Sequence, residues 1–239
     1  MGSVTLRNDG APPFTLGVLM LETRFPRPLG DIGNPASFMF PVRYKLVRGA
    51  SPERVVRERA AGLLEPFIGA ARELIDEGCS AITTSCGFLV LFQDALAAAL
   101  PVAVMTSCLL QLPAIEKRLP PGKRAGVLTI DSASLTQDHL AAAGAQVDTP
   151  IEGTQSGVEF TRRILGNEAT LDIDLARQDI VDAALRLTTR HPEVAALVLE
   201  CTNMPPYADA VRRATGLPVF DALTSIWNLR TAGTTLRPA

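Results

Sequence analysis

Short apolar runs alternate with helix-like patterns along the whole chain. The apolar runs are typical of strands and cover residues 16–21, 41–47, 81–85, 102–105, 125–130, 146–148, 196–199 and 218–220. The helical patterns cover residues 51–78, 89–100, 109–118, 135–143, 175–189, 207–215 and 225–231, with a break or kink expected at Pro66. Strands separated by helices pair in parallel, and buried parallel strands are continuously apolar. The pattern therefore predicts an α/β protein with mostly parallel sheets flanked by helices.

The second half of the chain repeats the first. Three segments match in order: Gly17-Val-Leu-Met-Leu-Glu22 with Gly126-Val-Leu-Thr-Ile-Asp131, Ala81-Ile-Thr-Thr-Ser-Cys86 with Ala196-Leu-Val-Leu-Glu-Cys201, and Leu100-Pro-Val with Leu217-Pro-Val. A duplicated α/β unit explains these matches better than chance does. We expect two pseudo-symmetric lobes with a cleft between them. The first lobe comprises residues 1–115 and 218–239, and the second comprises residues 116–217.

Two cysteines end equivalent strands of the two repeats. Cys86 is followed by Gly87, and Cys201 by Thr202 and Asn203. Ligands bind outside the carboxyl ends of parallel strands, and a thiol near a helix N-terminus has its pKa lowered toward the thiolate. We expect the two thiols to meet one small molecule from opposite sides.

Such a pair is suited to moving a proton between the two faces of a carbon atom. One thiolate takes the proton while the opposing thiol supplies another. The other cysteines fit this role less well. Cys79 begins its strand and is expected at the wrong end of the sheet, and Cys108 has no cysteine counterpart in the second repeat.

Further polar residues near the same edge are candidates for substrate binding. They are Ser85, Gly87, Thr106, Ser107, Thr202, Asn203 and Arg24. The hydroxyls of Thr106 and Ser107 are equally suited to capping the next helix, and Arg24 is suited to clamping a carboxylate. Residues 23–40 form a long segment that either covers a site or is disordered. Glu200 precedes Cys201, so on a regular strand it would face the opposite way, unless the turn at the strand end changes its direction.

Composition removes several classes of function. The 239 residues are 47% hydrophobic and 20% charged, with a formal net charge of −2, which is too balanced for binding nucleic acid or anionic lipid. The four cysteines form no CxxC pair, and the two histidines, His139 and His191, are remote from them in sequence. No GxGxxG fingerprint or Walker loop is present. We expect neither metal nor cofactor, and we expect His139 on an exposed helix surface.

No segment predicts export or membrane insertion. The first fourteen residues lack the basic and apolar regions of a signal peptide. The most apolar window, residues 87–105, is interrupted by Gln93, Asp94 and Pro101. The expected location is a reduced cytoplasm, where thiols are available for chemistry.

With these motifs the chain resembles the aspartate/glutamate racemase superfamily. Glu200-Cys201-Thr202-Asn203 is similar to the Gly-Cys-Thr-His turn of glutamate racemases, and Thr84-Ser85-Cys86-Gly87 occupies the place of their Cys-Asn-Thr turn. The resemblance implies a cofactor-independent enzyme with two lobes, acid/base roles for Cys86 and Cys201, and a homodimer. Asn203 stands where glutamate racemases have His, and their Asp-Ser-Gly motif is missing after the first strand. A plain glutamate racemase is therefore not expected.

The sequence favours a racemase or epimerase that acts on the α-proton of a small carboxylate, amino-acid-like or hydantoin-like. An alternative within the superfamily is a cis–trans isomerase or decarboxylase in which one cysteine attacks as a nucleophile or donates a proton. An alternative of another class is a non-catalytic protein that binds a small molecule.

Overall fold

The protein contains two parallel sheets of four strands each. The computed structural model describes residues 14–235, so the start of the chain, on which the signal-peptide prediction rests, lies outside the described residues. The first sheet has the order β2-β1-β3-β4 and the second the order β6-β5-β7-β8. The strands are β1 (Leu16–Met20), β2 (Val42–Leu46), β3 (Ala81–Thr84), β4 (Ala103–Met105), β5 (Arg124–Thr129), β6 (Ile151–Gly153), β7 (Val194–Leu199) and β8 (Val219–Phe220). The predicted α/β class is confirmed.

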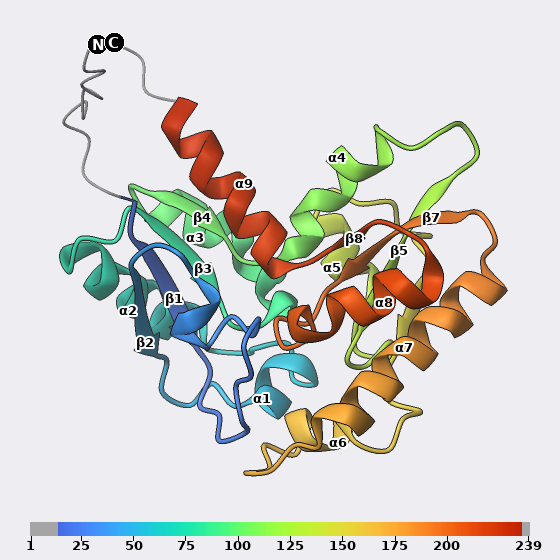
Figure 1. The fold of residues 1–239 in the computed structure, drawn as a ribbon. Helices are drawn as coiled ribbons and strands as arrows, with labels where there is room; N and C mark the ends of the chain where they lie inside the picture. Colours follow the sequence, from blue (N-terminus) through green and yellow to red (C-terminus); the bar gives the residue numbers. More distant parts are fainter. Residues whose placement is uncertain (1–13, 236–239) are drawn as a thin grey trace, which may run out of the picture.

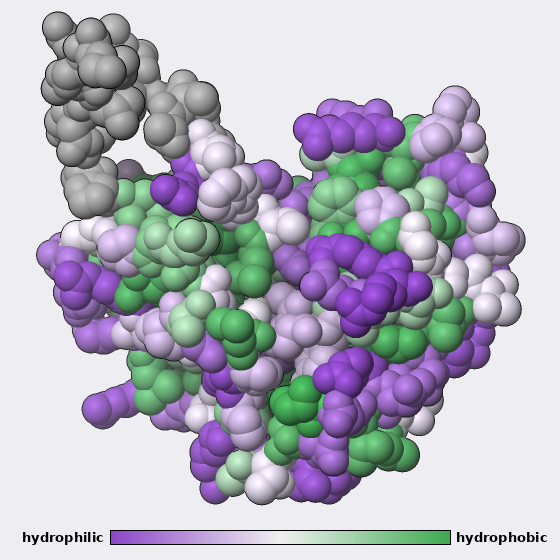
Figure 2. Space-filling view, viewed as in Figure 1, coloured by the Kyte–Doolittle hydropathy of each residue, from purple (hydrophilic) through white to green (hydrophobic). Residues whose placement is uncertain are grey.

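Helices flank both sheets (Figure 1). The α-helices are α1 (Pro52–Val56), α2 (Leu64–Asp76), α3 (Gln93–Ala99), α4 (Leu112–Glu116), α5 (Gln137–Ala142), α6 (Phe160–Leu165), α7 (Ile173–Arg190), α8 (Ala208–Thr215) and α9 (Ala222–Thr235). Short 3₁₀ helices are η1 (Pro35–Ser37), η2 (Gly87–Phe92), η3 (Cys108–Gln111) and η4 (Pro205–Tyr207). Figure 2 shows hydrophilic side chains over α8, the helix that carries Asp209, Arg212 and Arg213.

The two sheets have the same topology, as the internal repeat predicts. β1 and β5 occupy equivalent positions, and so do β3 and β7, which lead to the two cysteines. Gly17 and Gly126 are matched in the repeat for a packing reason. A Cβ at Gly17 would lie 2.7 Å from Cδ1 of Ile82, and one at Gly126 would lie 2.9 Å from Cδ2 of Leu187. Both strands therefore need a residue without a side chain at this point.

The end of the chain is shared between the two halves. β8 pairs with β7 in the second sheet, whereas residues 218–239 are assigned to the first lobe by the sequence. Helix α9 packs against the first sheet, where Ala222 and Ile226 join a buried cluster with Leu16 and Val18. Residues 219–220 thus lie in the second sheet, and the following helix lies on the first.

Some expected elements are displaced. Pro66 is the third residue of α2, where a missing N–H breaks no helical hydrogen bond, and the helical range is instead interrupted before Leu64. Arg59 and Ala60 have positive φ angles of 56° and 53° in that interruption. The strand expected at residues 146–148 lies at Ile151–Gly153. Helix α6 lies in a range for which no element was expected.

Most buried apolar residues of both halves form one large cluster, separate from the smaller cluster under α9. The large cluster includes Leu19 and Ile82 from the first sheet and Val127 and Val198 from the second. Among the helices of residues 14–235, none combines the length and the apolarity that a membrane crossing requires.

Candidate active site

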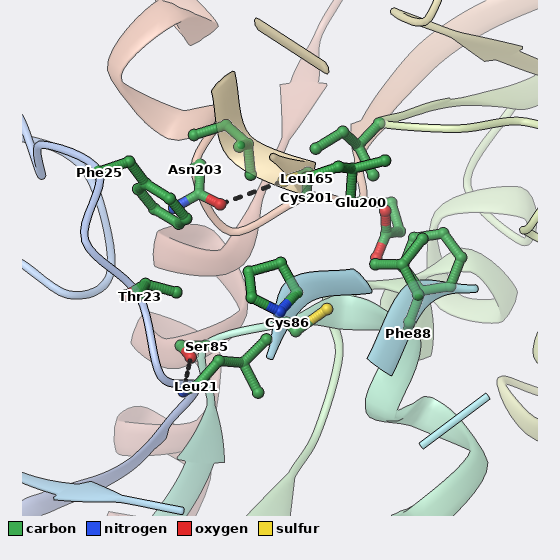
Figure 3. A pocket seen from close by; sticks show the side chains of 14 residues that line it. Leu21, Thr23, Phe25, Ser85, Cys86, Phe88, Leu165, Glu200, Cys201 and Asn203 are labelled. Carbon is green, nitrogen blue, oxygen red and sulfur yellow. Dashed lines mark hydrogen bonds between the residues drawn. The ribbon is translucent and has the colours of Figure 1, made fainter. Parts of the chain in front are cut away.

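Both predicted cysteines line one cavity. It lies beyond the carboxyl ends of β1 and β3 on one side and β5 and β7 on the other, and its empty space, including the part open to solvent, is about 330 Å³. Its lining consists of Leu21, Thr23, Phe25, Pro52, Val56, Ser85, Cys86, Phe88, Ile130, Ile164, Leu165, Glu200, Cys201 and Asn203. Figure 3 shows Cys86 and Cys201 in this pocket, coming from different parts of the chain. The tertiary structure thus brings the two sequence-equivalent thiols together.

Cys86 lies at the junction between β3 and η2. Its backbone is extended, with φ −155° and ψ 122°, and it occupies the position just before the first turn of η2. The backbone N–H of Phe88 donates to its sulfur, and this hydrogen bond favours the thiolate. The residue as a whole is partly exposed, whereas Cys201 is buried.

Cys201 lies at the end of a chain of hydrogen bonds that begins in the long segment after β1. Its Sγ donates to Oδ1 of Asn203 at 3.5 Å, and Nδ2 of Asn203 donates to Oδ2 of Asp31 at 2.7 Å. The other oxygen of Asp31 accepts from Nη1 of Arg27 at 2.9 Å. Because Asp31 can only accept, it fixes the amide of Asn203 with its oxygen toward the thiol.

Burial dominates the electrostatics of both thiols. It raises the pKa of Cys86 and of Cys201, and the charge that Glu200 carries when ionised raises both pKa values further. This corrects the expectation of thiolates stabilised by helix N-termini. The helical turns after the cysteines are short 3₁₀ segments, and their N–H groups do not offset the loss of water.

Glu200 also faces the cavity. It is fully buried, and Thr129 Oγ1 donates to its Oε2 at 2.8 Å. Burial raises the pKa of Glu200 to about 8. The expectation for a regular strand, that Glu200 faces away from the site of Cys201, is not met because β7 ends at Leu199.

The remaining predicted site residues divide into two groups. Ser85 and Asn203 line the cavity beside the cysteines, whereas Thr202, Gly87, Thr106, Ser107 and Arg24 are not among its lining residues. Thr202 Oγ1 donates to the carbonyl of Ser85 at 2.6 Å and so links the two cysteine turns.

The residues outside the lining have other contacts. Ser107 Oγ accepts from the N–H of Leu109 at 3.2 Å and caps η3, while Thr106 Oγ1 donates to Gln93 at 2.8 Å. Arg24 is exposed, and its backbone N–H donates to Asn167. Substrate contacts by these residues stay predictions.

The segment over residues 23–40 is ordered against the site. Thr23 and Phe25 line the cavity, and Asp31, only 1% exposed, reaches Asn203. The sequence left two interpretations of this segment open: that it covers a site, or that it is disordered. Its length was the available signal, but the sequence contains no pattern that singles out Asp31 or Phe25.

The cavity has an apolar lining without a cation. None of the described residues that line it is Lys, Arg or His. Within residues 14–235, no cluster of three or more His, Cys, Asp or Glu side chains could hold a metal ion. The groups available for chemistry are therefore the two thiols, the buried carboxyl of Glu200 and several hydroxyls.

Comparisons with known proteins agree with this architecture. The family model for Asp/Glu/hydantoin racemases matches residues 50–228. Among solved structures, a mutant of arylmalonate decarboxylase with bound sulfate superimposes with a TM-score of 0.63, at 18% identity over 94% of this chain and 97% of that one. A glutamate racemase isoform from Bacillus anthracis gives a TM-score of 0.59, at 18% identity over 93% of this chain and 81% of that one. At these identities the likeness concerns the fold.

Curated relatives are more similar in sequence. A dimethylsulfoniopropionate lyase from Durusdinium sp. clade D is 32% identical over 219 residues, which cover 88% of this chain and 72% of the relative. Dimethylsulfoniopropionate lyase 7 from Emiliania huxleyi (strain CCMP1516) is 34% identical over 222 residues, which cover 88% of this chain and 64% of the relative. The family match extends over more than half of the chain, and the chain therefore belongs to the Asp/Glu/hydantoin racemase family of α/β enzymes.

Proposed function

We propose that this protein removes the proton next to the carboxylate of a small substrate, and that it is a lyase that cleaves dimethylsulfoniopropionate. The single observation that carries the proton-transfer step is the presence of Cys86 and Cys201 in one largely apolar cavity. The similarity to dimethylsulfoniopropionate lyases supports this substrate. The relatives are longer than the matched region, which spans 72% of the first and 64% of the second.

The reaction balances without a cofactor. A cysteine thiolate takes the α-proton, and the electron pair of that C–H bond forms the double bond of acrylate. The bond between the β-carbon and sulfur breaks, and dimethyl sulfide leaves with its electron pair. The thiol then returns the proton to water. Because the leaving group is neutral, it needs no proton, and one cysteine is sufficient for cleavage.

The cavity suits a small zwitterion of this kind. Phe25 and Phe88 offer aromatic rings to a sulfonium cation, an interaction worth about 0.5–2 kcal/mol, and at Phe25 the guanidinium of Arg27 already covers one face at 4.5 Å from the ring centroid. Ser85 Oγ accepts from the N–H of Leu21, and Thr23 Oγ1 accepts from Arg27. Each hydroxyl therefore keeps its hydrogen for the substrate carboxylate.

The surroundings of the two sulfurs favour Cys86 as the base in cleavage. The Asn203 oxygen, held by Asp31, accepts from the Cys201 thiol and so favours its protonated form. Both sulfurs accept a backbone N–H, from Phe88 at Cys86 and from Asn203 at Cys201, but Cys86 has no side-chain acceptor of this kind among the described residues. We assign proton removal to Cys86 on this ground.

Racemisation or epimerisation of a small carboxylate is the second candidate. The observation that favours it is the pair of thiols at equivalent strand ends, since inversion of a stereocentre needs one acid/base group on each face. In that reaction Cys86 and Cys201 exchange roles between the two enantiomers.

Proton NMR in heavy water tests both candidates. The protein is incubated with dimethylsulfoniopropionate and, separately, with a panel of chiral carboxylates and hydantoins. We expect acrylate and dimethyl sulfide to form. Cys86→Ala should lower the cleavage rate by about 10²–10⁴-fold, the usual contribution of a general base, and Cys201→Ala should lower it less.

The matched control is Cys79→Ala, because Cys79 is buried in the first half and does not line the cavity. It should retain cleavage. For racemisation, both cavity cysteines should be required equally. Wild-type protein that neither cleaves dimethylsulfoniopropionate nor exchanges the α-hydrogen of any compound would contradict the enzymatic proposal and favour a binding protein.

A further inference from the structure

Glu200 is a fully buried acid in the candidate site that proton transfer between the cysteines does not use. Its side chain lines the same cavity as Cys86 and Cys201. Thr129 Oγ1 donates to Oε2, but Oε1 has no hydrogen-bond partner among the described residues. Leaving a buried polar oxygen unpaired is costly, so an unpaired oxygen in a cavity wall points to a missing ligand.

The chain makes room for this carboxyl at Gly87. A Cβ at Gly87 would lie 2.3 Å from Oε1 of Glu200 and 2.5 Å from its carbonyl oxygen. The carboxyl therefore packs directly against the backbone that follows Cys86, at the side of the pocket where Figure 3 shows Phe88. A glycine at this position lets the carboxyl of Glu200, from the second half of the chain, reach the turn that carries Cys86 in the first half.

The surroundings of Glu200 oppose a negative charge. The titratable groups that interact with it are the thiols of Cys86, Cys108 and Cys201, and no cation lines the cavity. Burial raises the pKa of Glu200 to about 8, so the side chain is mainly neutral at pH 7. Since Oε2 accepts from Thr129, the acidic proton belongs on Oε1.

We propose that neutral Glu200 is a further catalytic residue, which donates a hydrogen bond from Oε1 to the carboxylate of the substrate. Removal of an α-proton places additional negative charge on the carboxylate oxygens, and a fixed neutral donor in a dry site stabilises that charge. Glu200 keeps its proton throughout. This inference deepens the proposed function and rests on its proton-removal step.

The proposal predicts how activity depends on pH. Below pH 8 the carboxyl is a donor. As the pH rises through about 8 it becomes a carboxylate, which repels the substrate carboxylate and opposes a thiolate at Cys86. Ionisation of Glu200 therefore lowers the rate on the alkaline side, in the range where deprotonation of the thiol alone would raise it.

Three variants separate this role from a structural one. Glu200→Gln keeps a donor and an acceptor at the same positions but cannot ionise. Glu200→Leu keeps the approximate volume and removes the donor. Thr129→Val removes the hydrogen bond that favours the ionised form, so it should move the titration of Glu200 to higher pH.

The rates of cleavage and of α-hydrogen exchange are measured against pH for each variant. We expect Glu200→Leu to lose about 10²–10³-fold, as when an oxyanion donor is removed. Glu200→Gln should retain more activity than Glu200→Leu, and its alkaline decline should disappear. If Glu200→Gln loses as much as Glu200→Leu, or if it keeps the wild-type alkaline decline, the donor role is wrong.

A measurement without turnover distinguishes failure of this inference from failure of the proposed function. Infrared spectroscopy of protein labelled with ¹³C-glutamate, wild type minus Glu200→Gln, follows the protonated carboxyl directly. We expect a midpoint near pH 8 in the free protein. Saturating propionate, a carboxylate without a leaving group, should raise that midpoint in wild type.

Propionate should raise the midpoint because a neighbouring anion disfavours ionisation. A midpoint near the ordinary value of 4.5, or one that propionate does not move, would overturn the role of Glu200 even if cleavage occurs. Conversely, protein that is inactive on every substrate contradicts the proposed function, while the propionate titration still decides whether Glu200 binds a carboxylate.

Discussion

Cys86 and Cys201 end equivalent strands, yet their immediate surroundings differ. Both sulfurs accept a backbone N–H, but only Cys201 also donates to a side-chain amide, which Asp31 holds in place. The sequence identified both positions from the repeat alone. It predicted pKa values lowered by helix N-termini, whereas burial raises both, because burial is set by the closing of one half on the other.

Gly87 gives a prediction at the scale of a single residue. Its replacement by Ala should reduce stability by about 1–3 kcal/mol, as overpacking does, because the added Cβ meets both the carboxyl and the backbone of Glu200. Activity should fall as well, since the same contact positions the turn of Cys86. Urea unfolding and the rate of substrate conversion are the measurements.

Gly69→Ala is the matched control. Gly69 lies within α2, is exposed, and has no atom within 4 Å of an added Cβ. This substitution should stabilise the protein by about 0.5–1 kcal/mol through its helix propensity and leave activity unchanged. Equal effects of the two substitutions would contradict the packing argument at Gly87.

At the scale of elements, α5 departs most clearly from expectation. His139 was expected on an exposed surface but is completely buried. Its Nδ1 accepts from the N–H of Thr136 in a capping box, and its ring packs edge-to-face on Phe88 at 5.2 Å between centroids. The helical period shows which residues share a face, but not that a 3₁₀ segment of the other half covers that face.

This burial predicts a pH-dependent stability. Burial lowers the pKa of His139 from 6.5 to about 4, so between these values the unfolded chain binds the proton more tightly than the folded one. The contribution of neutral, buried His139 to the stability of the folded state is therefore complete above pH 6.5, and it is lost as the pH falls toward 4. The shift corresponds to about 3 kcal/mol at most.

His139→Gln isolates the contribution of this side chain. Gln suits the same capping-box position but does not titrate. The free energy of unfolding, measured in urea at pH 7 and at pH 4.5, should fall more in wild type than in the variant. An identical fall in both proteins would show that other groups account for the acid sensitivity.

At the scale of the whole molecule, contacts between the two halves surround the site. Thr202 bonds to Ser85, and Cys108 Sγ donates to the carbonyl of Leu199 at 3.0 Å. On the outside, Arg59 pairs with Asp138 at 2.7 Å. Together with the shared apolar cluster, these contacts make the cavity a product of both halves.

We predict that the two halves unfold in one transition. Trp227, the single tryptophan, lies exposed on α9 beside Pro205 and Ala208 of the second half, so its fluorescence reports on the place where α9 meets that half, whereas far-ultraviolet circular dichroism reports on the helices and strands of both halves. The midpoints of urea unfolding by fluorescence and by circular dichroism should coincide, because the large buried cluster contains residues of both halves. Separate midpoints would show that each half has an independent core.

The sequence by itself determined the parallel α/β architecture, the internal repeat and the two cysteine positions. These features follow from local apolar runs and from matched segments, which need no knowledge of distant contacts. The same local information placed Pro66 correctly within a helical range. It could not show that Pro66 lies in the first turn of α2, because the start of α2 depends on the preceding residues.

Only the tertiary structure decided what surrounds the cysteines. It turned Glu200 into the cavity, placed Asp31 behind Asn203 and buried His139 under Phe88. Each of these contacts joins residues that are far apart in the sequence. The physical reason is that a segment packed against a strand end decides two things: the direction of the side chains there and how much water they lose. That segment is distant in the sequence, so local patterns do not reveal it.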